Sequence, residues 1–130
     1  MKSKITANRD NCEEIYHVFR ELGQTISLLH SKNIIHGDLT TSNIMINLDR
    51  VLYLIDFGLS QIKNSVEEKA IDLYIFEKSI ICDDISVIVD KDKLIQSFIE
   101  GYKESSNFNI ETLKRLDKVK QRGRKRVSIG

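Results

Sequence analysis

Proline is absent from these 130 residues, and cysteine occurs only twice. Without proline, element boundaries have to be located from hydrophobic periodicity. Cys12 and Cys82 have no metal-ligand spacing and lie in helical patterns, which favours reduced, buried thiols in a cytoplasmic or nuclear protein over a disulfide or a zinc site. No apolar run approaches the roughly 20 residues that a membrane helix needs, and nothing at the N-terminus has the pattern of a secretory signal.

The overall charge is nearly balanced but unevenly distributed. The 20 basic and 19 acidic residues give a net charge of +1, and a hydrophobic content of 41% is typical of one folded domain. Residues 111–130 carry eight Lys or Arg and two acids, which is +6, so the remainder carries −5. This asymmetry predicts a basic tail on a mildly acidic body.

Hydrophobic spacing predicts an α+β domain that is mostly helical. Asn11 and Glu14 resemble a capping box that opens a first helix ending near Ser31. Apolar runs at 44–46 and 51–55 predict a β-hairpin around the turn 47–50. Three further helices are expected, at 66–81, 92–102 and 110–120.

The most informative residues are His36-Gly37-Asp38-Leu39-Thr40-Thr41-Ser42-Asn43 and Asp56-Phe57-Gly58. An Asp with an Asn five residues later, then Asp-Phe-Gly after a hairpin, is how kinase-fold phosphotransferases hold Mg²⁺-ATP and a hydroxyl nucleophile. Asp38 is placed to orient the attacking hydroxyl. Asn43 and Asp56 offer the hard oxygen ligands that Mg²⁺ prefers. Gly58 is expected to permit a sharp turn after Phe57.

Each of these residues has an ordinary structural explanation when it is taken alone. A loop Asp is usually a turn or cap residue, and Asp-Phe-Gly occurs by chance in many proteins. The coincidence of three features at kinase spacing favours a phosphotransferase site. We assign His36 a structural role beneath the loop, because the base in kinases is Asp and not His.

At this point the sequence resembles one family. The two motifs, the segment Glu67-Glu68-Lys69-Ala70-Ile71-Asp72-Leu73-Tyr74 and the terminal Arg122-Gly123-Arg124-Lys125-Arg126 closely resemble the small atypical kinase subunit of the KEOPS complex, the PRPK family related to the RIO kinases. The resemblance runs from about residue 12 to the end. It implies a protein-kinase-like C-terminal lobe over 1–120, with a small hairpin at the catalytic loop, and a basic tail over 121–130.

The resemblance also implies roles for individual residues. Asp38 matches the catalytic base, while Asn43 and Asp56 match the ligands of ATP-bound Mg²⁺. Asp72 matches a buried Asp that braces the catalytic loop through its backbone amides, a sound role for a carboxylate that accepts several N–H groups.

The implied activity is that of an atypical serine/threonine kinase or ATPase. It would serve the KEOPS subunit that makes N6-threonylcarbamoyladenosine at position 37 of certain tRNAs. The tail residues Arg122, Arg124, Lys125 and Arg126 are expected to contact tRNA or this partner enzyme, although such a run is more often a solvated charge cluster.

The sequence departs from ordinary protein kinases in three ways. Thr40 replaces the usual Lys two residues after the catalytic Asp. Gly58 and Asp72 are only 14 residues apart, which leaves no room for a long activation segment. The six glycines form no glycine-rich loop, so we expect a large lobe only, with the N-terminal lobe absent. Such a chain should turn over ATP weakly or not at all and should expose apolar surface.

Two other functions remain open. One is a truncated, non-catalytic kinase lobe that only docks a partner, which the missing small lobe favours. The other is a small-molecule phosphotransferase of the aminoglycoside or choline type. Those enzymes also use His-Gly-Asp but usually continue with His-Pro, and they lack the basic terminus found here.

Overall fold

The computed structural model describes residues 12–49, 51–82, 90–105 and 109–129, with side-chain surroundings up to Gly123. Four helices and two short strand pairs make up this part of the chain. In order they are α1 (Cys12–Ser31), β1 (Ile34–Ile35), the single 3₁₀ turn η2 (Thr41–Asn43), β2 (Ile44–Ile46), β3 (Leu52–Leu54), β4 (Gln61–Ile62), α2 (Val66–Cys82), α3 (Lys91–Glu104) and α4 (Asn109–Ile129). The fold is therefore a mostly helical α+β arrangement, as the sequence predicted.

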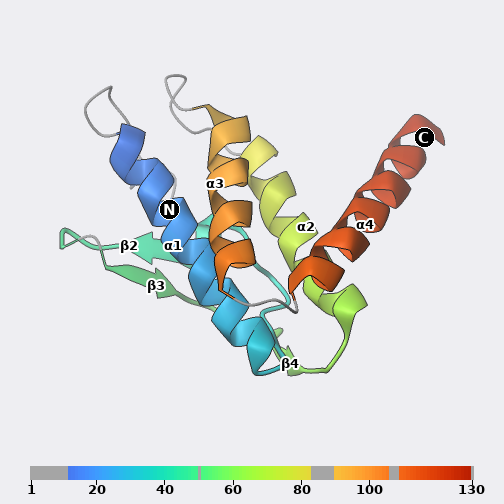
Figure 1. The fold of residues 1–130 in the computed structure, drawn as a ribbon, viewed down its shortest axis with the longest axis horizontal. Helices are drawn as coiled ribbons and strands as arrows, with labels where there is room; N and C mark the ends of the chain where they lie inside the picture. The colour runs from blue at the N-terminus through green and yellow to red at the C-terminus, as the bar shows by residue number, and fades with distance from the viewer. Residues whose placement is uncertain (1–11, 50, 83–89, 106–108, 130) are drawn as a thin grey trace.

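The helices form one packed body, and the strands lie at its edge (Figure 1). α1 packs along α3, and α2 packs on α4. Figure 1 shows α4 leaning outward so that its C-terminal end lies away from α1. None of the described helices is long and apolar enough to cross a membrane.

Two antiparallel strand pairs frame the loop that carries the His-Gly-Asp motif. β2 pairs with β3, with Ile44 opposite Leu54, as the predicted hairpin requires. β1 pairs with β4, with Ile34 opposite Ile62, a pairing that the sequence analysis did not foresee. The motif loop thus begins at one strand pair and ends at the other.

Capping residues set several helix ends. Ser65 accepts a hydrogen bond at its Oγ from the Glu68 amide at the start of α2, and Asp90 accepts from the amides of Asp92 and Lys93 at the start of α3. Asn33, with φ of 61°, follows α1 in the left-handed conformation and turns the chain into β1. The predicted cap residue Asn11 lies outside the described residues.

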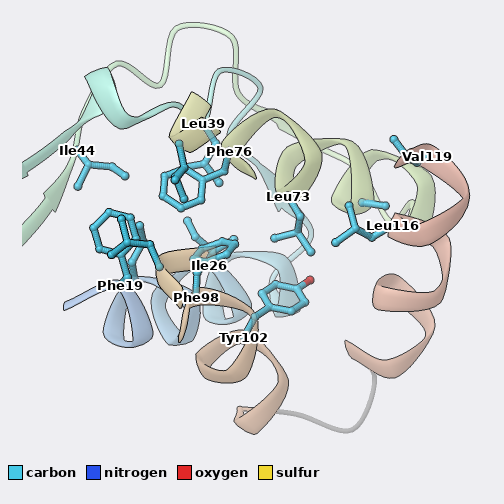
Figure 2. Packing of buried hydrophobic residues seen from close by; sticks show 14 residues of the cluster. Phe19, Ile26, Leu39, Ile44, Leu73, Phe76, Phe98, Tyr102, Leu116 and Val119 are labelled. Atoms are coloured by element: carbon cyan, nitrogen blue, oxygen red, sulfur yellow. The ribbon is translucent and has the colours of Figure 1, made fainter. Parts of the chain in front are cut away.

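All four helices contribute to a single core (Figure 2). Its centre is aromatic: the Phe76 ring lies 6.0 Å from the Phe19 ring and 4.5 Å from the Phe98 ring, measured between centroids. Burying a side chain of this size contributes about 1.5–3 kcal/mol. The largest fully buried apolar side chains are Phe19, Leu22, Ile26, Leu39, Ile44, Leu73, Phe76, Ile80, Leu94, Phe98 and Tyr102.

Two predictions were wrong. The last helix does not end at Lys120 but continues to Ile129. The residues that follow Lys120 are mostly good helix formers with only one glycine, so no helix-breaking residue ends the helix there. The proposed boundary between a lobe at 1–120 and a tail at 121–130 therefore falls inside a continuous helix, and it stays a prediction. Cys82 is exposed rather than buried, since it is the last residue of α2.

Candidate active site

Asp72 of α2 binds the backbone at the start of the loop from His36 to Asn43. Asp72 is buried, and its Oδ2 accepts the His36 amide at 2.8 Å while its Oδ1 accepts the Gly37 amide at 3.0 Å. His30 of α1 lies 3.0 Å from the same carboxylate through its Nε2. Three N–H groups thus converge on one buried carboxyl group, so its oxygens have hydrogen-bond partners away from water.

His36 lies inside the loop and connects its two ends. Its side chain is fully buried, its Nδ1 accepts the Asp38 amide at 3.1 Å, and its Nε2 lies 3.0 Å from the carbonyl oxygen of Ile55. One nitrogen therefore accepts and the other donates, which is the hydrogen-bonding pattern of the neutral ring. The ring also packs on Phe57, with 4.6 Å between centroids. With both nitrogens engaged, His36 is a structural residue in this arrangement.

Asp38 and Asn43 are joined by hydrogen bonds across the loop. The Asn43 amide nitrogen donates to the carbonyl oxygen of Asp38 at 2.8 Å and to the Asp38 carboxylate at 3.2 Å. Because Nδ2 is turned toward Asp38, the amide oxygen of Asn43 is left for another ligand. The same bonds orient the Asp38 carboxylate, which is only partly buried.

Asp56 lies beside Asn43 because of the hairpin. The Ile55 amide donates to the Asn43 carbonyl oxygen at 2.9 Å, extending the β2–β3 ladder by one step, and Asp56 follows directly. Asp56 is exposed and has a φ of 59°. A non-glycine residue in this left-handed region is uncommon, and such strain is concentrated at functional sites.

Gly58 does not have the backbone role expected of it. Among the described glycines only Gly37, with φ of 89°, occupies the left-handed region, and a Cβ at Gly58 would meet only the Asp56 carboxylate at an ordinary 3.4 Å. The turn after Phe57 is instead closed by Ser60, whose amide and hydroxyl both donate to the Phe57 carbonyl oxygen. The unusual conformation belongs to Asp56, which the sequence analysis treated as a ligand only.

The donor set at this end of the hairpin fits Mg²⁺. It offers one amide oxygen, from Asn43, and one carboxylate, from Asp56, and both are hard ligands. Within the described residues no cluster of three or more His, Cys, Asp or Glu side chains could hold a metal. Mg²⁺ commonly takes one or two protein side chains and completes its shell with water and substrate phosphates, so two donors are sufficient.

The basic residues of α4 differ in whether the structure shows an acidic partner for them. Arg122 of α4 pairs with Glu67 of α2 at 2.5 Å, and Arg115 pairs with the other oxygen of Glu67 at 3.2 Å. Together the two guanidinium groups lower the pKa of Glu67, the hydrogen bond from Arg122 being the largest cause. Of the other tail residues, the structure describes the helical backbone of Arg124, Lys125 and Arg126 but not their side chains.

Two residues that support the loop were missed by sequence analysis. His30 follows the core residue Ile26 by four positions, so the helical period placed it on the buried face, but the analysis ended the apolar stripe at Leu29. Ser79 of α2 accepts the Thr41 amide at 3.2 Å and donates to the Phe76 carbonyl oxygen. No sequence pattern marks Ser79, because its partner is distant along the chain.

Comparison with known proteins agrees with this geometry. The family model for the protein kinase domain matches residues 3–79, more than half of the chain. The EKC/KEOPS complex subunit bud32 of Dictyostelium discoideum is 39% identical over 118 residues, which is 90% of this chain and 45% of that protein. The EKC/KEOPS complex subunit BUD32 of Encephalitozoon cuniculi is 44% identical over 112 residues, 86% of this chain and 52% of that protein.

A third relative is a much longer protein. A probable bifunctional tRNA threonylcarbamoyladenosine biosynthesis protein of Methanosphaera stadtmanae is 36% identical over 113 residues, 86% of this chain and 19% of that protein. The chain spans about half the length of the KEOPS subunits it matches. It is similar to these KEOPS complex subunits, and because the protein kinase domain model matches more than half of its residues, the chain belongs to the protein kinase family.

Proposed function

We propose that this chain is the large lobe of an atypical serine/threonine kinase or ATPase that acts as a KEOPS subunit and supports threonylcarbamoyladenosine modification of tRNA. Membership of the protein kinase family implies the use of ATP. Two relatives support the assembly and the pathway: one is named as a KEOPS complex subunit, and the other as a probable bifunctional tRNA threonylcarbamoyladenosine biosynthesis protein. A cytoplasmic and nuclear location, and the threonylcarbamoyl-transferase subunit as chief partner, are part of this proposal.

The observation that carries the proposal is the link from Asp38 through Asn43 to the end of β3. Asn43 binds Asp38 with its amide nitrogen and Ile55 with its main-chain oxygen. One residue therefore fixes the spacing between the proposed base and Asp56. Random loop acids would not be joined in this way.

In the proposed mechanism, Asp38 accepts a hydrogen bond from the attacking hydroxyl or water and orients it. Asn43 and Asp56 would hold Mg²⁺, which when bound neutralises charge on the ATP phosphates. Asp72 and His36 keep the loop backbone in place, so little reorganisation is needed when the substrate arrives.

The segment after Asp56 is short, and its length limits which phosphoacceptor the site could use. Only the short strand β4 lies between Phe57 and the start of α2 at Val66. A protein kinase that grips an extended peptide needs a longer segment there. The proposed acceptor is therefore water or a group presented by a docked partner, and not a free linear peptide.

A non-catalytic docking lobe is the alternative, and one observation favours it. Large apolar side chains are exposed along the hairpin and the strand that follows. They are Leu48, Val51, Tyr53, Ile55, Phe57, Leu59 and Ile62. An apolar surface of this kind is typical of a face that another domain or protein covers.

Calorimetric titration with ATP, with and without Mg²⁺, distinguishes the two functions. The proposal predicts Mg²⁺-dependent binding that is lost in Asp56→Ala and weakened at least about tenfold in Asn43→Ala, since each removes one metal ligand. Asp49→Ala is the matched control, because Asp49 is an exposed acid in the turn of the same hairpin. No binding by a folded chain, or equal binding by Asp56→Ala, would favour the docking lobe.

A further inference from the structure

A chain of buried hydrogen bonds runs from α4 to the candidate active-site loop. The side chain of Thr112 in α4 is a hydrogen-bond partner of the Tyr102 hydroxyl in α3. The Tyr102 hydroxyl lies 2.7 Å from Nδ1 of His30 in α1. Nε2 of His30 lies 3.0 Å from Asp72 in α2, which accepts the loop amides of residues 36 and 37. Four helices thus meet the loop through one polar path.

Because the side chains in this path are buried, each of them needs its hydrogen bonds to the others. The exposed fraction is 0% for Tyr102 and His30 and 1% for Thr112 and Asp72. Figure 2 shows the Tyr102 ring at the edge of the apolar core, beside Leu73. A polar group left unpaired at such a site costs about 1–3 kcal/mol, so each member depends on the next.

The direction of the bonds follows from Asp72. A carboxylate accepts, so Nε2 of His30 donates to it, and a ring that carries its one proton on Nε2 has Nδ1 as an acceptor. In that tautomer the Tyr102 hydroxyl donates to Nδ1. Burial raises the pKa of Tyr102, which keeps its proton available for this bond.

We propose that Tyr102 is a positioning residue of the candidate active site. Its hydroxyl holds His30 in the tautomer that donates to Asp72, and Asp72 in turn holds the loop that carries Asp38 and Asn43. Any effect of Tyr102 on catalysis rests on the proposed function, because the loop serves phosphoryl transfer only if Asp38 and Asn43 act as described. Its effect on the position of the loop does not depend on the proposed function.

The hydroxyl can be tested apart from the ring. The Tyr102 ring packs edge-on against His30, with 5.5 Å between centroids and an interplanar angle of 77°. Tyr102→Phe keeps this contact and removes only the donor to Nδ1. Tyr16→Phe is the matched control, because the Tyr16 hydroxyl is also a hydrogen-bond partner, accepting the Asp90 amide at 3.2 Å at a distant, exposed point.

The experiment is amide hydrogen exchange by NMR on the full chain, with ¹⁵N detection of the histidine rings. In Tyr102→Phe, the His36 and Gly37 amides should exchange at least about fivefold faster relative to the slowest core amides, as expected from one lost hydrogen bond. Tyr16→Phe should leave that ratio unchanged. The ¹⁵N shifts of His30 should show the Nε2–H tautomer in the unmodified chain.

Two results would overturn the inference. One is an unchanged ratio of loop to core exchange in Tyr102→Phe, which would make the hydroxyl merely structural. The other, which needs no variant and so holds even if Tyr102→Phe fails to fold, is an Nδ1–H tautomer of His30. Failure of the proposed function has a separate signature: the loop amides respond to Tyr102→Phe as expected, but the unmodified chain binds no Mg²⁺-ATP.

Discussion

Gly101 of α3 lies directly against the main-chain carbonyl of Arg20 in α1, so closely that a Cβ at position 101 would overlap its oxygen. Gly23 of α1 lies in the same way against the carbonyl of Phe98 in α3. The two helix backbones therefore touch at two points. Both glycines lie inside helices, where they would otherwise be unfavourable by about 1 kcal/mol relative to Ala.

Replacing Gly101 should separate these helices. Gly101→Ala must move a backbone carbonyl, and we expect it to lower the free energy of unfolding by about 2–3 kcal/mol, measured by urea denaturation. Gly123→Ala is the internal comparison, because the group in the way there is the far end of the Tyr74 side chain, which can turn aside. That variant should remain within about 1 kcal/mol of the unmodified chain. Equal losses at both positions would contradict this explanation.

Asp72 should be among the most sensitive polar residues. Asp72→Ala leaves two loop amides and His30 without their acceptor in a buried site. We expect a loss of about 2–4 kcal/mol in the free energy of unfolding. Asp92→Ala is a suitable control, since Asp92 is an exposed acid in the first turn of α3. A loss at Asp72 no larger than at Asp92 would rule out the bracing role.

Hydrophobic spacing located all four helices, although it ended the last one at Lys120 instead of Ile129, and the motif loop was found because that pattern is local. It missed the pairing of β1 with β4, since two-residue strands carry too few side chains to show an alternation. It missed His30 and Ser79 because their partners, Asp72 and Thr41, are 42 and 38 positions away. Long-range hydrogen bonds of this kind leave no periodic signal.

The stability of the chain should depend on pH through Glu77 of α2. Glu77 is buried; Lys120 binds its Oε1 at 2.9 Å, and its Oε2 has no hydrogen-bond partner among the described residues. Burial raises the pKa of Glu77 above its usual 4.5, and the Lys120 contact only partly opposes this. A raised pKa in the folded state means that the protonated carboxyl group of Glu77 stabilises the folded state at low pH. This stabilisation is lost as the pH rises through that pKa.

Glu77→Gln should remove this dependence, because glutamine resembles the neutral acid. The difference in the free energy of unfolding between Glu77→Gln and the unmodified chain should shift in favour of the variant from about pH 4 to about pH 8. Urea denaturation across that range measures it. Glu111→Gln, at an exposed position of α4, is the control for replacing a glutamate that is not buried. A difference for Glu77→Gln that moves the other way would show that the Lys120 contact dominates.

The basic residues should divide into two groups in tRNA binding. Arg122 is engaged by Glu67, so Arg122→Ala should leave the salt dependence of tRNA affinity nearly unchanged. Replacing Arg124, Lys125 and Arg126 together by Ala should reduce the slope by about one for each phosphate contact that is lost. Filter binding over a series of salt concentrations measures both slopes. Identical slopes for the triple variant and the unmodified chain would exclude an RNA contact by these residues.

The helical course of α4 beyond Arg122 determines how far these charges extend. A helix rises about 1.5 Å per residue, so the backbone of residues 124–129 covers about 9 Å, whereas an extended strand of that length would cover about 20 Å. Because Arg115 and Arg122 both bind Glu67 of α2, this helical segment starts at a fixed point on the body of the protein. In the proposed complex, the phosphate or acidic groups of a partner would therefore have to lie along the helix axis to meet these charges.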